Sequence, residues 1–241
     1  MSWIVLILSA AAGGVVQTVT GFGAAVVMML FLPSFLGMLG APAIVQTVCA
    51  GLSLPLAIRF RKSADLRAVL FPAVIYIACS AAIILVIDRF DLDVLKLLFG
   101  IFLILLAAYS LLLSKKLRVK ANWRTALLFS VISGAFSGLF GIGGPLMAVY
   151  FLAATDTKET YVGTSQVFFA ICNTFNFIVR CARGIYTVSL IPMTLVGIAA
   201  INLGKLLGLR VLDRLNAELL RKLVYAFIGI SGLITVIQYL I

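Results

Sequence analysis

Long apolar runs, separated by short polar or charged stretches, cover almost the whole chain. The eight runs are 3–36, 41–58, 66–87, 94–113, 125–154, 161–179, 185–209 and 219–241. A helix needs about 20 apolar residues to cross a hydrocarbon core about 30 Å thick. Six runs have the length of a single span, whereas the first and fifth are too long and contain glycines near their middle. The pattern predicts an all-α polytopic membrane protein in which two segments are broken.

Composition supports this prediction. Of the 241 residues, 63% are hydrophobic, 11% are charged and none is histidine, whereas a soluble domain carries about a quarter charged residues. The chain begins Met1–Ser2–Trp3 and enters apolar sequence without a basic region or cleavage site. We therefore expect a first membrane segment there rather than a removed signal peptide.

The net charge of +11 comes from basic residues in the loops between the apolar runs. They are Arg59, Arg61, Lys62 and Arg67 in one loop and Lys115, Lys116, Arg118, Lys120 and Arg124 in another, while Asp88, Asp91 and Asp93 form an acidic turn. The positive-inside rule places 59–67 and 114–124 in the cytoplasm and 88–93 outside. This predicts a multi-pass membrane protein whose basic residues follow from its topology, with no nucleic-acid partner.

The two halves of the chain resemble each other at an offset of 120 residues. The matched pairs are Gly14/Gly134, Gly21/Gly141, Gly23/Gly143, Phe31/Phe151, Leu32/Leu152, Gln46/Gln166, Ser53/Asn173 and Pro72/Pro192. We expect an N-terminal membrane repeat at 1–113, a basic cytoplasmic linker at 114–123 and a C-terminal repeat at 124–241. Internal repeats are typical of secondary transporters, whose site lies at the repeat interface near mid-membrane.

Each repeat would contain four segments, and the broken first segment decides how the repeats are related. If it crosses the membrane once, the repeats are parallel. If it enters and returns as a re-entrant hairpin, the second repeat is inverted. The pieces 3–20 and 24–36 are each short for a span, which favours the hairpin. The loop charges give divided evidence. Arg180 and Arg183 would face outward in the inverted arrangement, against the positive-inside rule. The basic residues that would be cytoplasmic, as inversion requires, are Lys205, Arg210, Arg214, Arg221 and Lys222.

The sequence SGLFGIGGPLMAV, residues 137–149, interrupts the fifth run. A break after Gly143–Gly144 lets Pro145 begin a new helix, since proline suits the first helical turn. Such a start presents free N–H groups and a partial positive charge, which favour an anion. The motif Gly21–Phe22–Gly23 offers the same device in the first half, beside Gln17, Thr18 and Thr20. The alternative is that these glycines only allow close helix packing.

Amide side chains follow each glycine motif. Gln166 and Asn173 share one helix face and Asn176 extends it, while Gln46 and Ser53 repeat the spacing. They would hydrogen-bond an anion's oxygens, or alternatively join helices; Thr164 and Ser165 are weaker candidates. The full candidate set for substrate binding is Gln17, Thr20, Gly21, Phe22, Gly23, Gln46, Gly141, Gly143, Gly144, Pro145, Gln166, Asn173 and Asn176.

The distribution of charge favours an anionic cargo. All eight acidic residues lie in loops or at span ends, so a proton relay of buried carboxylates is hard to assemble and a cation lacks partners. We expect Lys205 and Arg180, the deepest basic residues, to extend to the membrane interface. The four cysteines, Cys49, Cys79, Cys172 and Cys181, lack metal-ligand spacing, and we expect no metal, cofactor or catalytic residue.

Two stretches resemble the TauE/SafE family of sulfite exporter-like membrane proteins. They are GGVVQTVTGFGAAVV in the first half and SGAFSGLFGIGGPLMAVYFL in the second, and ETYVGTSQVFFAICNTFNFIVR is also similar to the family's span after the second motif. The likeness covers essentially the whole chain. It implies transport of sulfite, sulfonates or related sulfur-containing organic anions across the plasma membrane.

Together these observations predict a secondary transporter that moves a small sulfur-containing oxyanion by alternating access between the repeats. A passive anion channel is the main alternative, and a membrane enzyme is weaker because no general acid or base is present. The expected partners are the anionic substrate and the lipid bilayer. The sequence leaves open the substrate's identity, its direction, a coupling proton or sodium ion, and homo-oligomer formation.

Overall fold

The computed structural model describes residues 2–89 and 120–216, with single residues and short stretches within 91–101 and 218–230. Over these residues the chain forms helices joined by turns and short loops. The helices are α1 (Ser2–Thr20), α2 (Ala24–Met29), α3 (Pro33–Phe60), α4 (Leu66–Val86), η1 (Ile87–Arg89), α6 (Trp123–Phe140), α7 (Gly144–Ala154), α8 (Lys158–Ala182), η3 (Val188–Leu190) and α9 (Ile191–Arg214). Most residues of the predicted spans 94–113 and 219–241 and of the linker 114–123 lie outside the described part.

Six helices of the described part are long and apolar enough to cross a membrane. They are α1, α3, α4 with η1, α6, α8 and η3 with α9. The prediction of an all-α polytopic membrane protein is therefore confirmed.

Polar residues between the apolar runs fix where several helices begin. The Asp65 side chain accepts hydrogen bonds from the N–H groups of Arg67 and Ala68 at the start of α4. Asn122 and Thr125 form a reciprocal capping box at the start of α6. Such caps satisfy N–H groups that have no partner within the helix, so the polar gaps in the sequence mark helix starts.

α3 begins earlier than the apolar pattern predicts. The pattern has residues 33–36 close the first segment and a new segment begin at residue 41. The element α3 runs from Pro33 to Phe60, but Gly37 within it is non-helical, with φ +70° and ψ 176°, so two helices meet at a kink there. The left-handed φ favours glycine, and the longer helix begins after Gly37, close to the boundary that the pattern predicts.

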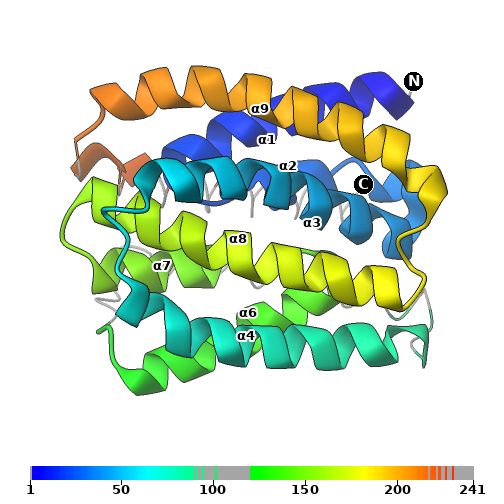
Figure 1. Cartoon of the computed structure of the whole chain (residues 1–241), viewed down its shortest axis with the longest axis horizontal. Helices are drawn as coiled ribbons and strands as arrows, with labels where there is room; N and C mark the ends of the chain where they lie inside the picture. Colours follow the sequence, from blue (N-terminus) through cyan, green and yellow to red (C-terminus); the bar gives the residue numbers. More distant parts are fainter. Residues whose placement is uncertain are drawn as a thin grey trace.

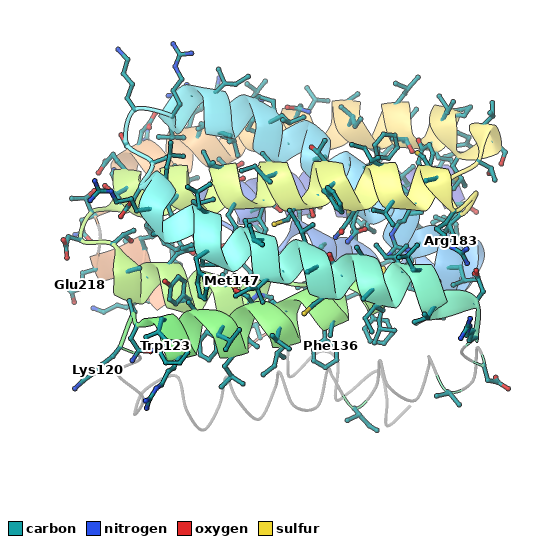
Figure 2. All side chains as sticks on the ribbon, turned by 60° about the horizontal axis from the view of Figure 1, so that its bottom comes forward. Lys120, Trp123, Phe136, Met147, Arg183 and Glu218 are labelled. Atoms are coloured by element: carbon teal, nitrogen blue, oxygen red, sulfur yellow. The ribbon has the colours of Figure 1, made fainter. Side chains whose placement is uncertain are left out.

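The long helices lie side by side, and their ends define two faces of the bundle (Figure 1). At one face, which we call the Lys158 face, Lys158 donates hydrogen bonds to the carbonyls of Leu212 (3.2 Å) and Leu215 (2.7 Å). At the other, the Asp88 face, Asp88 pairs with Arg183. Figure 2 shows Lys120 and Glu218 at one end of the molecule and Arg183 at the other. The helices α3, α4, α8 and α9 run from one of these faces to the other.

Both glycine motifs break their helices, as the sequence predicts, and in each case the following helix turns back. Beyond the α1 break, a Cβ built on Gly13 would lie 3.0 Å from Cα of Ala24, the first residue of α2. Beyond the α6 break, Ser130 Oγ lies 3.8 Å from Met147 Sδ of α7. Each broken segment therefore folds back on itself as a helical hairpin.

The two hairpins enter from opposite faces. In Figure 1, α1 runs from the Asp88 face toward the Lys158 face, whereas α6 runs the opposite way. α2 leads into α3 at the Asp88 face, and α7 leads into α8 at the Lys158 face. The tips of the two hairpins meet inside the bundle, where a Cβ on Gly144 would lie 3.0 Å from Cβ of Phe22.

Each broken helix packs against a helix from the other half of the chain. A Cβ on Gly14 of α1 would lie only 2.1 Å from the carbonyl oxygen of Ile201 on α9, and a Cβ on Gly134 of α6 only 2.6 Å from that of Tyr76 on α4. Small residues permit this close approach of backbones in membrane helices. Close packing, the alternative interpretation of the glycines, is therefore the role of these two.

Candidate functional site

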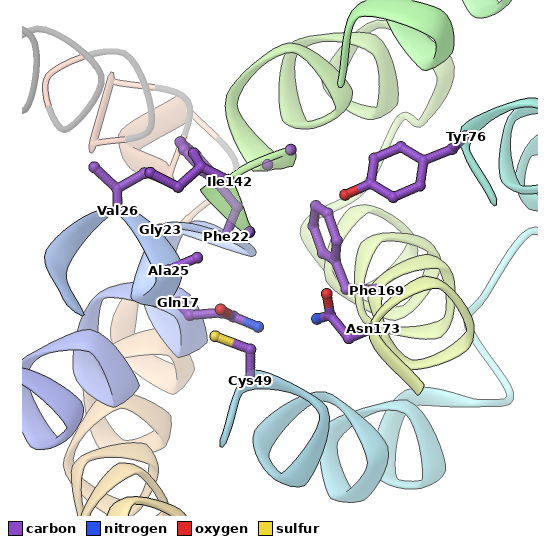
Figure 3. A pocket seen from close by; sticks show the side chains of 13 residues that line it. Gln17, Phe22, Gly23, Ala25, Val26, Cys49, Tyr76, Ile142, Phe169 and Asn173 are labelled. Carbon is purple, nitrogen blue, oxygen red and sulfur yellow. The ribbon is translucent and has the colours of Figure 1, made fainter. Parts of the chain in front are cut away.

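A small cavity lies where the hairpin tips meet, about midway along α3, α4 and α8 (Figure 3). The residues that line it are Gln17, Phe22, Gly23, Ala25, Val26, Cys49, Tyr76, Gly141, Ile142, Gly143, Gly144, Phe169 and Asn173. The centre of a water-sized sphere can move through about 20 Å³ of the cavity. By the same measure, about 10–15 Å³ is enough to hold one water molecule. In this conformation the cavity therefore holds about one water molecule and must widen to admit an oxyanion.

The start of α7 forms one wall of the cavity. Its cap residue is Gly143, which has no side chain to accept hydrogen bonds from the first N–H groups of the helix, and Pro145 lies in the first turn. The first N–H groups of a helix have no partner within the helix and carry partial positive charge. A Cβ on Gly143 would lie 2.1 Å from Tyr76 Oη and 2.7 Å from the Ser133 carbonyl oxygen. Only glycine fits at this position without moving its neighbours.

The motif Gly21–Phe22–Gly23 also reaches the cavity, but the helix that begins after it is shorter than the sequence predicts. Phe22 and Gly23 line the cavity, and Gly23 caps α2 with φ +107°. α2 contains only six residues, and a helix dipole is the sum of its aligned peptide units. The 11-residue α7 therefore dominates the electrostatic field of the pair.

The two broken helices end in matching ways. Gly21 N–H donates to the Gln17 carbonyl (2.8 Å) and Gly141 N–H to the Ser137 carbonyl (2.9 Å). Both glycines are left-handed, with φ +84° and +72°, the conformation that commonly ends a helix.

Gln166 and Gln46 each donate hydrogen bonds to the end of the broken helix in the other half of the chain. Gln166 Nε2 donates to the Gly21 carbonyl (2.8 Å), and Gln46 Nε2 donates to the Ser137 carbonyl (3.0 Å) and to Ser137 Oγ (2.9 Å). Both glutamine side chains are fully buried. Their N–H₂ groups, expected to face substrate oxygens, are engaged with backbone carbonyls here. A direct role in substrate binding requires that these bonds open.

The other predicted polar residues divide into two groups. Gln17 and Asn173 line the cavity, where Figure 3 shows their amides on opposite sides. Gln17 Nε2 already donates to Ser53 Oγ (3.0 Å) and Gln166 Oε1 (3.4 Å), whereas Asn173 makes no hydrogen bond with the described residues. Asn176 and Thr20 do not line the cavity and are hydrogen-bonded within the protein. Asn176 joins Ser80 (2.7 Å) to Ser137 (3.2 Å), while Thr20 Oγ1 contacts backbone carbonyls.

Pro145 and Gly141 take the places that the sequence assigned to them, at the start of α7 and at the end of α6. Thr164 accepts a hydrogen bond from the Asp65 N–H (2.9 Å), at the Lys158 face. Ser165 Oγ is buried without a partner. Neither lines the cavity, so Thr164 and Ser165 remain the weaker candidates.

Sequence reasoning missed three cavity residues that carry distinctive chemistry. Cys49, Tyr76 and Phe169 come from α3, α4 and α8 and line the cavity together. Figure 3 shows the Tyr76 hydroxyl directed into it. No local motif marks these residues, because their position depends on how three separate helices pack.

The position of the Arg180 side chain differs from the sequence-based prediction. The sequence predicts that its side chain extends to the membrane interface, but it is fully buried. Its Nε donates to Gln46 Oε1 (2.8 Å) and its Nη2 to the Gly138 carbonyl (2.7 Å). The side chain turns inward because the last carbonyls of α6 lack helical partners and attract a cation. Lys205 is partly buried and donates to Asn202 Oδ1 (2.6 Å).

The fold and this cavity define a class: a polytopic helical membrane protein in which two helical hairpins, α1 with α2 and α6 with α7, meet at a buried cavity. The family model "Sulfite exporter TauE/SafE" matches residues 6–235. The chain therefore belongs to the TauE/SafE family, a family of membrane transporters.

A curated relative agrees with this family. The chain is 28% identical over 159 residues to a protein of Methanocaldococcus jannaschii that bears the name "Probable membrane transporter protein". The alignment spans 62% of this chain and 60% of the relative. No solved structure matches the chain significantly.

Proposed function

We propose that this transporter is a secondary transporter for a small sulfur-containing oxyanion: sulfite, a sulfonate or a related organic anion. The observation that carries the proposal is the cavity at the start of α7, whose first N–H groups receive no side-chain cap and whose wall includes the Asn173 amide, without a hydrogen bond to the described residues. Such donors bind oxyanion oxygens. The described residues place no carboxylate in the cavity lining, so a cation would lack a charged partner there.

We further propose that residues 1–113 and 124–241 are inverted repeats, joined by the linker 114–123, and that the substrate crosses by alternating access. The opposite directions of α1 and α6 and the matched ends at Gly21 and Gly141 support this relation. Two inverted units with a shared central site exchange conformations to open one face at a time.

The Lys158 face is proposed to lie in the cytoplasm. It carries exposed basic residues at 59–62, whereas the Asp88 face carries the Asp88–Arg183 pair, and cytoplasmic loops are enriched in Lys and Arg. The plasma membrane is the proposed location. A partly open cavity of about 170 Å³, lined by Phe60, Lys158, Glu159, Val162, Leu212 and Asp213, lies at this face and offers a proposed route to the central site.

A passive anion channel uses the same positive helix start, and transport kinetics distinguish it. Secondary transport saturates with substrate, whereas channel flux follows voltage without saturating at low concentration. A catalytic role is not proposed, because the cavity lining contains no histidine or carboxylate to act as general acid or base.

The test is ligand-induced thermal stabilisation of the detergent-purified protein. The ligands are sulfite, sulfate, thiosulfate, methanesulfonate, taurine and acetate, with tetramethylammonium chloride against sodium chloride as the cation control. A ligand at about 100 times its Kd adds roughly 2.7 kcal/mol to the free energy of unfolding. We expect sulfite or sulfonates to stabilise selectively. Stabilisation by the cation alone, or by none of the compounds, would refute an oxyanion site.

A further inference from the structure

Arg180 is a buried cation that has no counter-ion among the described residues. Its side chain is fully buried, and its Nη1 has no hydrogen-bond partner in the part of the chain that the structure describes. None of the ion pairs formed among the described residues includes it. An arginine keeps its charge at neutral pH, and burying a charge without a partner is costly. This arrangement requires an explanation beyond packing.

Capping the end of α6 explains the position of Arg180 but not its charge. The equivalent end of α1 is served by neutral donors: Gln166 binds the Gly21 carbonyl, and Tyr161 Oη donates to the Thr20 carbonyl (2.6 Å). The residue at the matching position of the first half, 120 residues earlier, is Phe60. A broken helix in this protein can therefore end without a cation, and the second half carries a charge that the cap does not need.

Arg180 also lies close to the central cavity. Gln166, Asn173 and Arg180 recur every seven residues on α8 and therefore share one helix face, with Asn173 in the cavity wall. Gln46, which accepts from Arg180, lies against Gly141 of the same wall, where its Cγ is 3.3 Å from a Cβ built on that glycine. The guanidinium is thus bonded to a side chain that borders the cavity wall, on the side of the Asp88 face.

We propose that Arg180 supplies the fixed positive charge that selects anions, and that its free Nη1 donates to an oxygen of the transported oxyanion. The inference rests on the proposed function and deepens it, because it names a charged, specificity-determining residue beside the neutral donors of the α7 start. The α6 carbonyl and Gln46 hold the guanidinium through Nη2 and Nε, which leaves Nη1 for the ligand. The anion then acts as the missing counter-ion while it passes between the cavity and the Asp88 face.

The experiment compares Arg180→Gln, Arg180→Lys and Arg183→Gln with the wild type, using titrations of methanesulfonate and sulfite against the purified, folded proteins. Arg183→Gln is the matched control, because it removes one positive charge from the exposed end of the same helix. A charged donor contributes roughly tenfold to 100-fold to affinity, so Arg180→Gln should raise Kd by about that factor. Arg180→Lys, which keeps the charge but loses the planar fork, should give a smaller increase, and Arg183→Gln should leave Kd within about threefold.

The outcomes separate this inference from the proposed function. If the wild type binds neither anion, the proposed function fails and the inference fails with it. If the wild type binds and a folded Arg180→Gln or Arg180→Lys protein keeps wild-type affinity, only the role of Arg180 is refuted. If Arg180→Gln does not fold, Arg180→Lys decides, since it keeps a cation for the α6 end and has no group at the place of Nη1.

Discussion

Glycines in this chain do two different jobs, and the atoms around each one distinguish them. Gly14 and Gly134 lie within the helical stretches of α1 and α6, where the backbone of a neighbouring helix excludes a larger residue. Gly143 lies at a helix start with φ −125°, which other residues adopt, so its requirement is purely spatial. The hydroxyl of Tyr76 occupies the place that a Cβ would take.

Gly143→Ala should therefore impair the site through Tyr76. Overpacking of this kind costs about 1–3 kcal/mol, and we expect a lower melting temperature and an anion affinity reduced by roughly tenfold. Gly40→Ala is the matched control, because a Cβ there would lie 3.7 Å from Leu36, an ordinary contact. Thermal unfolding and anion titration of both variants check the prediction. Equal anion affinity in the two would show that Tyr76 can yield without disturbing the site.

At the scale of elements, the two helix breaks depend on amides donated by the opposite half. Gln166→Leu removes the donor to the Gly21 carbonyl and leaves that oxygen buried, which should reduce the free energy of unfolding by about 1–3 kcal/mol. Hydrogen exchange at residues 21–23 should accelerate at the same time. Thr47→Val is the control, because the Thr47 hydroxyl donates only to Ala43 of its own helix.

Chemical denaturation and hydrogen exchange of the two variants provide the measurement. A Gln166→Leu protein as stable as Thr47→Val, with unchanged exchange at the break, would contradict a structural role for this amide. In that case the original expectation, a glutamine available to the substrate, would be strengthened.

The elements were largely predictable from the sequence, whereas the pairing of their side chains was not. Long apolar runs and the glycine motifs predicted the spans and both breaks, because hydrophobic length and helix-breaking residues act locally. Arg180 was misjudged because it lies near the end of its apolar run, and sequence gives no sign of the α6 carbonyls that draw it inward. Tyr76 and Cys49 were missed for a related reason, since their place in the cavity arises from the packing of distant helices.

At the scale of the whole molecule, the opposed hairpins predict which face each loop reaches. Lys62 is exposed in the turn between α3 and α4, and Thr187 is exposed in the loop between α8 and η3, four residues after Arg183 of the Asp88 face. In a Cys181→Ser background, a membrane-impermeant maleimide should label Thr187→Cys on intact cells. Lys62→Cys should react only after the membrane is permeabilised, because the basic loop is expected in the cytoplasm. The reverse pattern would invert the orientation, and labelling of both from outside would contradict opposite faces.

The pairing of α1 with α9 also bears on how the protein is made. Gly14 meets a residue, Ile201, that follows it by 187 positions in the chain. At a synthesis rate of about 5–20 residues per second, α1 emerges from the ribosome roughly ten to forty seconds before its partner exists. During that interval its glycine-lined surface faces lipid or a temporary neighbour. The final packing of α1 must therefore wait until α9 has been inserted into the membrane.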